Sequence, residues 1–172
     1  TMRWIIDHLN PRDSFQIVDF GNSDTMLFEK PARVTAATRR RARAHIDGLQ
    51  ADGGTMMAEA VQRVTAMPAE DHRLRIVTFM TDGYVGNDFE VLDLVRRSRG
   101  TSRWFPFGTG NSVNRFLIEG MARVGGGEPE FVLLADAGEA VARRFYDRIA
   151  SPVLTDVRVA FEGLEVDDVE PS

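Results

Sequence analysis

The chain has 172 residues, of which 43% are hydrophobic and 27% charged, a composition that fits a folded domain and excludes collagen, coiled-coil and disordered proteins. Its 21 basic and 26 acidic residues give a net charge of −5, so the chain as a whole has no electrostatic drive toward nucleic acid or an anionic membrane. Cysteine is absent, which excludes disulfides, thiolate zinc sites and a cysteine nucleophile. No apolar run approaches the ~18 residues that a membrane-spanning helix needs.

The first third of the chain predicts a helix, a hairpin and a second helix. Met2–Leu9 has a short helical pattern, which Asn10-Pro11 ends. Phe15–Phe20 is expected to form a strand, and Thr25–Glu29 returns after a turn as its hairpin partner. Thr35–Leu49 carries an apolar stripe at helical spacing.

From residue 57 onward, helical patterns alternate with short apolar strands. The expected helices are Met57–Val64, Phe89–Ser98, Val113–Val124 and Ala137–Ile149, and the expected strands are Arg75–Met80, Arg103–Phe107 and Phe131–Leu134. Such alternation predicts an α/β fold, with a doubly wound and mostly parallel sheet covered by helices on both faces. Pro106 lacks a backbone N–H and therefore places its strand near a sheet edge.

The expected domain organisation follows from the point at which the alternation of helices and strands ends. Residues 1–150 are expected to form one α/β domain. Residues 151–172 are expected to form an exit segment or the start of a separate β module, because Val157–Phe161 alternates like a half-exposed strand.

Two loops carry candidate metal ligands at the end of the sheet where α/β proteins bind ligands. Asp82 directly follows the most apolar strand, so its carboxylate needs either a hard cation or a group of backbone N–H donors. Thr55 follows two glycines and stands at the head of a helix, where its hydroxyl suits Mg²⁺. Each residue also has a simpler interpretation, Asp82 as the cap of an Asp-Gly turn and Thr55 as an ordinary helix N-cap.

A third loop, Gly108–Ser112, supports a competing interpretation as an enzyme. Gly108, Gly110 and Val113 fall one glycine short of a dinucleotide fingerprint, and Ser112 lies in a sequence one glycine short of a nucleophile elbow. The alternative function is therefore an α/β hydrolase or a nucleotide-binding enzyme. No histidine is placed near Ser112 by the sequence, however, and no acid–base pair emerges, so an enzyme is not expected.

The basic run at Arg39, Arg40, Arg41 and Arg43 lies on a predicted helix. Because the sequence places no further basic residues on this face, we interpret the run as a solvated helix surface and not as a phosphate site.

Taken together, four segments resemble a von Willebrand factor type A domain. They are the hairpin that begins at Phe15, LQADGGT (Leu49–Thr55), RIVTFMTDG (Arg75–Gly83) and FGTGNSVNRFLIEGMARVGGG (Phe107–Gly127). IASPVLTDVRVAF (Ile149–Phe161) is similar to the exit segment of the inter-alpha-trypsin-inhibitor heavy-chain-like subgroup. The resemblance implies a mostly parallel sheet with one antiparallel edge strand.

The resemblance also implies a function, namely binding or adhesion to a protein or extracellular-matrix ligand through a metal-ion-dependent adhesion site. Such a site holds Mg²⁺ or Mn²⁺, and a carboxylate of the partner completes the coordination. Thr55 resembles the threonine ligand of this site, and Asp82 resembles the aspartate that holds the metal through water. The subgroup further implies a parent protein that is extracytoplasmic or membrane-anchored.

One feature of the family is missing from the sequence, which contains no Asp-x-Ser-x-Ser motif. The resemblance places this motif after a central strand that would precede Met2, so we expect the chain to be a fragment with an incomplete metal site. The free edge beside Arg75–Met80 would then expose unpaired backbone groups. Val157–Phe161, or a strand from a second copy in a homodimer, is the expected occupant of that edge.

Overall fold

The computed structural model describes residues 1–21, 24–49, 56–68, 73–81, 86–133, 138–150 and 162–163. At its centre is a parallel sheet of β5 (Ile76–Thr81), β6 (Arg103–Thr109) and β7 (Glu130–Val132), in the order β5-β6-β7. This confirms the strands and the parallel pairing expected from the alternating pattern. None of the described helices is long and apolar enough to cross a membrane.

The prediction that Pro106 places its strand at an edge is wrong, because β6 is the middle strand of this sheet. Arg103 donates its N–H to Arg75 on the β5 side, whereas Gly110 donates to Val132 on the β7 side. Alternate residues of a strand face opposite neighbours, so the nitrogen of Pro106 faces β7. Pairing with β7 begins only at Phe107, and the missing N–H therefore breaks no ladder bond.

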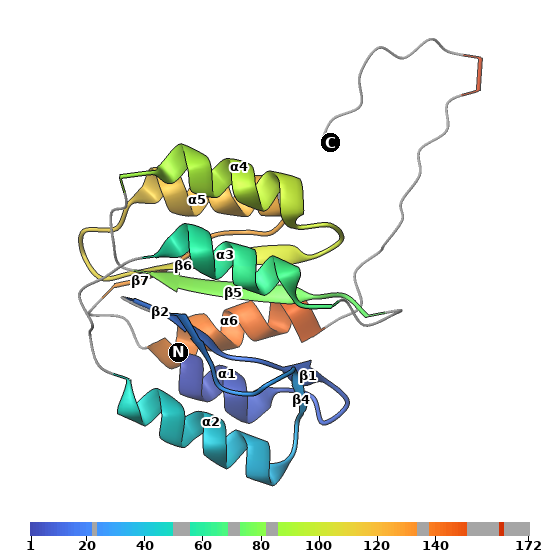
Figure 1. Cartoon of the computed structure of the whole chain (residues 1–172), viewed down its shortest axis with the longest axis vertical. Coiled ribbons are helices and arrows are strands. Elements are labelled where there is room, and N and C mark those ends of the chain that lie inside the picture. Colours follow the sequence, from blue (N-terminus) through green and yellow to red (C-terminus); the bar gives the residue numbers. More distant parts are fainter. Residues whose placement is uncertain are drawn as a thin grey trace.

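Helices cover both faces of the sheet, as expected (Figure 1). One face carries α3 (Met57–Ala66), α4 (Asp88–Ser98) and α5 (Arg115–Gly125), and the other carries α1 (Met2–His8) and α6 (Gly138–Ala150). The outer helix α2 (Ala36–Gly48) packs against α1. Trp104 lies in the core on the first face and Phe107 in the core on the second, and both are fully buried.

The expected hairpin is present as β2 (Val18–Phe20) and β3 (Asp24–Met26), which pair antiparallel. The expected strand is longer than β2, because the chain is interrupted at Gln16. The side-chain oxygen of Gln16 accepts the N–H groups of Ile17 and Phe28, both at 3.0 Å, in place of strand pairing. Before this break, β1 (Ser14–Phe15) pairs with β4 (Ala32–Arg33), and after it β2 pairs with β3.

The antiparallel hairpin forms its own ribbon and does not extend the parallel sheet, which differs from the single sheet that the resemblance implies. Within the described residues, no strand pairs with the outer edge of β5. The ring of Phe20 on β2 nevertheless stacks on Phe79 of β5, with centroids 4.8 Å apart. Thr78, in the middle of β5, is exposed. Residues 157–161, the expected occupant of this edge, lie outside the described residues, so their pairing and the homodimer stay predictions.

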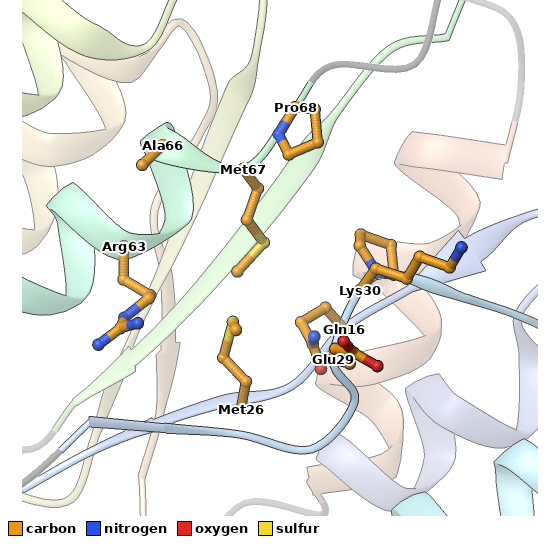
Figure 2. A pocket seen from close by; sticks show the side chains of 9 residues that line it. Gln16, Met26, Glu29, Lys30, Arg63, Ala66, Met67 and Pro68 are labelled. Atoms are coloured by element: carbon orange, nitrogen blue, oxygen red, sulfur yellow. The ribbon is translucent and has the colours of Figure 1, made fainter.

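A pocket of about 220 Å³ opens between the hairpin and the C-terminal end of α3 (Figure 2). Met26 and Met67 point toward one another across it. The guanidinium of Arg75, the residue before β5, donates to the carbonyls of Met67 and Pro68. The pocket therefore lies near the amino end of β5, away from the loops that carry the candidate ligands.

The arginine run on α2 is more than a solvated surface, which corrects the interpretation from sequence. Arg39 donates to the carbonyl of Leu9 at 2.5 Å, and Arg41 donates to that of Leu27 at 2.8 Å. Arg43 donates to the carboxylate of Asp7 on α1, and this hydrogen bond and the charge of Asp7 raise the pKa of Arg43. The helix uses these side chains to hold α1 and the hairpin region.

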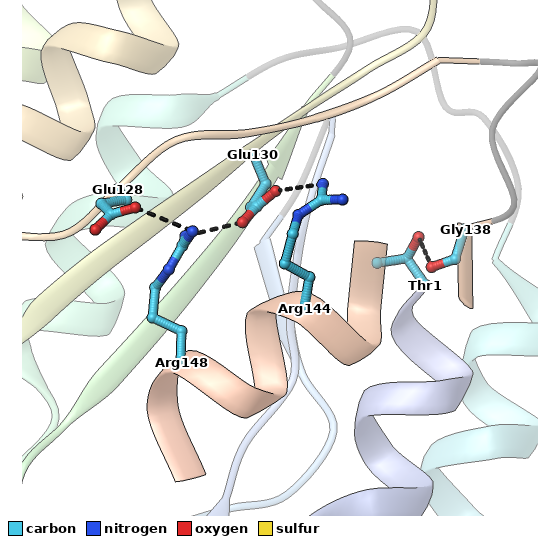
Figure 3. A network of polar contacts seen from close by, with 6 residues as sticks. All are labelled: Thr1, Glu128, Glu130, Gly138, Arg144 and Arg148. Atoms are coloured by element: carbon cyan, nitrogen blue, oxygen red, sulfur yellow. Dashed lines mark hydrogen bonds and ion pairs between the residues drawn. The ribbon is translucent and has the colours of Figure 1, made fainter. Parts of the chain in front are cut away.

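Glu130 is the centre of an ion-pair network between β7 and α6 (Figure 3). Its carboxylate lies 3.1 Å from Arg144 and 2.8 Å from Arg148, and Arg148 also reaches Glu128 at 3.0 Å. Glu130 is only 5% exposed, whereas Glu128 is 62% exposed. The network anchors α6 to the sheet. A separate hydrogen bond, from the Thr1 hydroxyl to the Gly138 carbonyl at 3.1 Å, ties the start of α6 to the start of α1.

Glu130→Ala is expected to lower the free energy of unfolding by about 1–2 kcal/mol, because it leaves two guanidinium groups without their buried partner. The cost stays below that of a fully buried pair because both arginines reach solvent and can be rehydrated. Chemical denaturation measures the difference. Glu128→Ala is the matched control and should change stability by less than about 0.5 kcal/mol, since it removes an exposed pair with the same Arg148. Equal losses in the two variants would contradict the assignment.

Candidate functional site

The candidate site lies at the carboxyl end of the parallel sheet. The first turns of α4 and α5 lie at this end, because these helices follow β5 and β6 along the chain. The N-terminus of α3 is there too, since Arg75 at the amino end of β5 binds the carbonyls at the opposite end of α3. Three helix N-termini therefore meet at one end of the sheet, where α/β folds bind their ligands.

The two predicted metal ligands, Thr55 and Asp82, lie outside the described residues. Their immediate neighbours are described. Met56 precedes the first turn of α3, and Thr81 is the buried last residue of β5, paired in register with Gly108. Within the described residues, no group of three or more His, Cys, Asp or Glu side chains is placed to hold a metal ion.

The glycines of the Gly108–Ser112 loop have structural roles. A Cβ on Gly108 would lie 2.4 Å from Cγ1 of Val113, so only glycine allows β6 to pass this close to the loop. Gly110 has a φ of +97° and donates its N–H to the Val132 carbonyl at 2.9 Å. Both glycines are thus explained without a bound nucleotide.

Ser112 gains no catalytic partner from the part of the chain that the structure describes. Its side chain is exposed. The ring of His8 contacts the Trp4 carbonyl at 2.8 Å, and Nε2 of His45 lies 2.6 Å from Asp19 on the hairpin. The hydrolase alternative therefore has no supporting geometry among the described residues.

A partly buried polar pair at this end was not predicted from the sequence. Nδ2 of Asn114 donates to Oδ2 of Asp88 at 2.9 Å, and Oδ1 of Asn114 accepts the N–H of Leu117 at 3.1 Å. Asn114 therefore caps α5 and at the same time ties it to the first residue of α4. Oδ1 of Asp88 is buried and has no hydrogen-bond partner among the residues that the structure describes. The sequence indicates this cap through Asn114 itself, an N-cap residue type that stands three residues before the apolar stripe of α5.

The family model for the von Willebrand factor type A domain matches residues 1–131. Human von Willebrand factor A domain-containing protein 5A is 34% identical over 149 residues, which are 86% of this chain and 19% of that protein. The chain thus spans about a fifth of the length of this relative.

Solved structures show the same fold. An aerotolerance-related membrane protein from Bacteroides fragilis has a TM-score of 0.70 at 12% identity, over 87% of this chain and 84% of the other. Proximal thread matrix protein 1 from the mussel byssus, solved with a zinc-occupied MIDAS motif, has a TM-score of 0.59 at 16% identity, over 84% and 38%. Manganese-loaded TRAP protein from Plasmodium vivax has a TM-score of 0.57 at 20% identity, over 82% and 61%. Because the family model matches most of the chain and the fold agrees, this chain belongs to the von Willebrand factor type A domain family.

Proposed function

We propose that the chain is part of a protein-binding module that recognises its partner at the carboxyl end of the sheet through a divalent cation. The observation that carries the proposal is the position of Thr55 and Asp82 in the sequence. The first directly precedes Met56 at the head of α3, and the second directly follows Thr81 at the end of β5. Two structural relatives bear manganese or a zinc-occupied MIDAS motif, which supports a cation at this end.

The chemistry of the two side chains fits Mg²⁺ or Mn²⁺. A hydroxyl and a carboxylate are hard oxygen ligands, and Mg²⁺ keeps several waters when it binds to one or two protein groups. In this proposal Thr55 supplies a direct hydroxyl ligand and Asp82 accepts hydrogen bonds from metal-bound water. An acidic side chain of the partner would displace one water, so that cation and partner bind together.

Within the described residues, no group of three or more acidic or histidine side chains is placed to compete for the cation. Asp88 is the nearest described carboxylate in the chain after Asp82, and its Oδ2 is already engaged by Asn114. The proposed cation is therefore assigned to Thr55 and Asp82 and not to Asp88.

Calorimetric titration of Mg²⁺ and then Mn²⁺ into this chain tests the proposal. We expect weak but measurable binding, because the chain supplies only two of the ligands of a complete site, and a loss of at least about tenfold in Asp82→Ala and in Thr55→Ala. Asp93→Ala is the control, because this exposed carboxylate on α4 pairs with Arg97 and should not affect the cation. Absence of binding to the unmodified chain, or equal binding by Asp82→Ala, would overturn the proposed site.

A further inference from the structure

Two exposed phenylalanines form an aromatic pair beside the candidate site. Phe89 is in the first turn of α4 and is 77% exposed, and Phe116 is in the first turn of α5 and is 52% exposed. Their ring centroids lie 5.3 Å apart with an interplanar angle of 62°. We name Phe89 and Phe116 the aromatic ledge.

The protein holds the ledge in place through buried contacts. Asp88 directly precedes Phe89, and Asn114 lies two residues before Phe116. The side chains of Asp88 and Asn114 are joined by a hydrogen bond. Farther along the same helices, a Cβ on Gly120 would lie 2.9 Å from a methyl group of Leu92, so the two helices pack closely. The helix starts that carry the two rings are thus held together before any partner arrives, which lowers the entropy cost of binding.

The contact between the two rings does not by itself explain why these two exposed positions carry apolar side chains. Such a contact stabilises the pair only slightly, and most of the Phe89 surface stays in water. Exposed apolar side chains also gather at this end. Of the seven large hydrophobic side chains that are exposed among the described residues, Met56, Phe89, Phe116 and Leu133 adjoin the carboxyl ends of the strands. Clustered exposed apolar side chains mark interaction surfaces, and aromatic residues dominate binding energy at interfaces.

The charges around the ledge indicate the chemistry of its partner. Asp88 and Glu90 flank Phe89, and among the described residues each has only an asparagine amide as its side-chain partner. Glu119 lies 3.7 Å from Arg115, whose guanidinium also stacks over Phe131 at 4.2 Å. Three carboxylates against one guanidinium repel an anionic membrane and a second copy of the same surface, and they attract basic side chains.

We propose that the aromatic ledge binds a protein segment that presents an apolar side chain next to lysine or arginine. The apolar side chain covers the two rings, and the neighbouring cation faces the exposed Glu90 and the ring faces. The proposal deepens the proposed function, because it places a second contact of the partner on the same end of the sheet. It does not require the divalent cation.

The experiment is an NMR titration of the ¹⁵N-labelled chain, in the presence of EDTA, with three capped hexapeptides. They are Lys-Lys-Leu-Leu-Lys-Lys, the same peptide with glycine in place of leucine, and the same peptide with glutamate in place of lysine. We expect the first peptide to shift the amide signals of residues 87–90 and 114–117. We expect the other two to bind at least about fivefold more weakly.

The double variant Phe89→Ser/Phe116→Ser should bind the first peptide about tenfold more weakly, with a small decrease in melting temperature from the lost ring contact. Leu74→Ser, which removes an exposed apolar side chain near the amino end of β5, is the matched control and should bind normally. Equal binding of the leucine and glycine peptides, full binding by the double variant, or a ledge that instead mediates self-association would overturn the proposal. Because EDTA removes the cation, these outcomes are independent of the Asp82→Ala titration, and either proposal can fail alone.

Discussion

Trp104→Ala is expected to lower the free energy of unfolding by about 3–5 kcal/mol, the range found when a large core side chain is truncated. Trp104 is fully buried in the middle strand of the sheet, and its indole N–H donates to the Ser102 hydroxyl at 3.0 Å. The indole belongs to the buried cluster that includes Leu117 and Met121, so its removal leaves a cavity there, and two glycines let the chain pass close to the Trp104 backbone. A Cβ on Gly125 would lie 2.4 Å from that of Trp104, and one on Gly127 would lie 2.1 Å from the Trp104 carbonyl oxygen.

Trp4→Ala is the matched control, because the chain has two tryptophans and either variant keeps one as a fluorescent reporter of unfolding. Trp4 is only half-buried on α1, where its ring stacks on His8 with centroids 3.7 Å apart. Its removal should cost less than half as much as that of Trp104. Urea titrations followed by fluorescence and by circular dichroism give both values. Similar losses in the two variants would show that the core is not centred on β6.

The parts of the fold that follow from local periodicity could be predicted from the sequence. β5 is a nearly all-apolar run, and the helices around it carry apolar residues at helical spacing, so their types and approximate bounds agree with the structure. The hairpin also follows from two β-rich runs that flank a turn. In each case the signal lies within about a dozen neighbouring residues.

The errors arose where one residue's role depends on a distant strand. Pro106 was assigned to an edge because a missing N–H normally breaks a central ladder, yet β7 is too short to reach it. The arginines of α2 were assigned to solvent because the sequence does not show that Leu9 and Leu27 bring their carbonyls within reach.

The candidate site likewise contains residues that local motifs predict and residues that only the folded structure brings together. Thr55 and Asp82 could be proposed because short motifs mark them, whereas Asp88 and Asn114 are 26 residues apart and meet only because α4 and α5 pack side by side. The same packing creates the aromatic ledge. No pattern within either helix indicates that Phe89 and Phe116 are in contact, since each alone looks like an ordinary exposed residue near a helix start.

Asn114→Ala should therefore reveal how strongly the two helices are coupled. The variant loses the N-cap of α5, worth about 1 kcal/mol, and removes the side-chain donor that the described residues provide to the half-buried carboxylate of Asp88, worth about 1–2 kcal/mol. We expect a total loss of roughly 2–3 kcal/mol in the free energy of unfolding, measured by chemical denaturation. Hydrogen exchange of the Leu117 amide should become faster, since this amide loses its acceptor.

Asn87→Ala separates this coupling from a general effect of removing asparagine at a helix start. Asn87 occupies the N-cap position of α4, but its side chain makes no capping hydrogen bond and donates to the exposed Glu90 at 3.0 Å. Its removal should change stability by less than about 0.5 kcal/mol. If Asn114 couples the helices, Asn114→Ala should also weaken peptide binding at the ledge, whereas Asn87→Ala should not. A destabilised Asn114→Ala variant that binds peptide normally would mean that the ring positions are set by the apolar contacts between α4 and α5 alone.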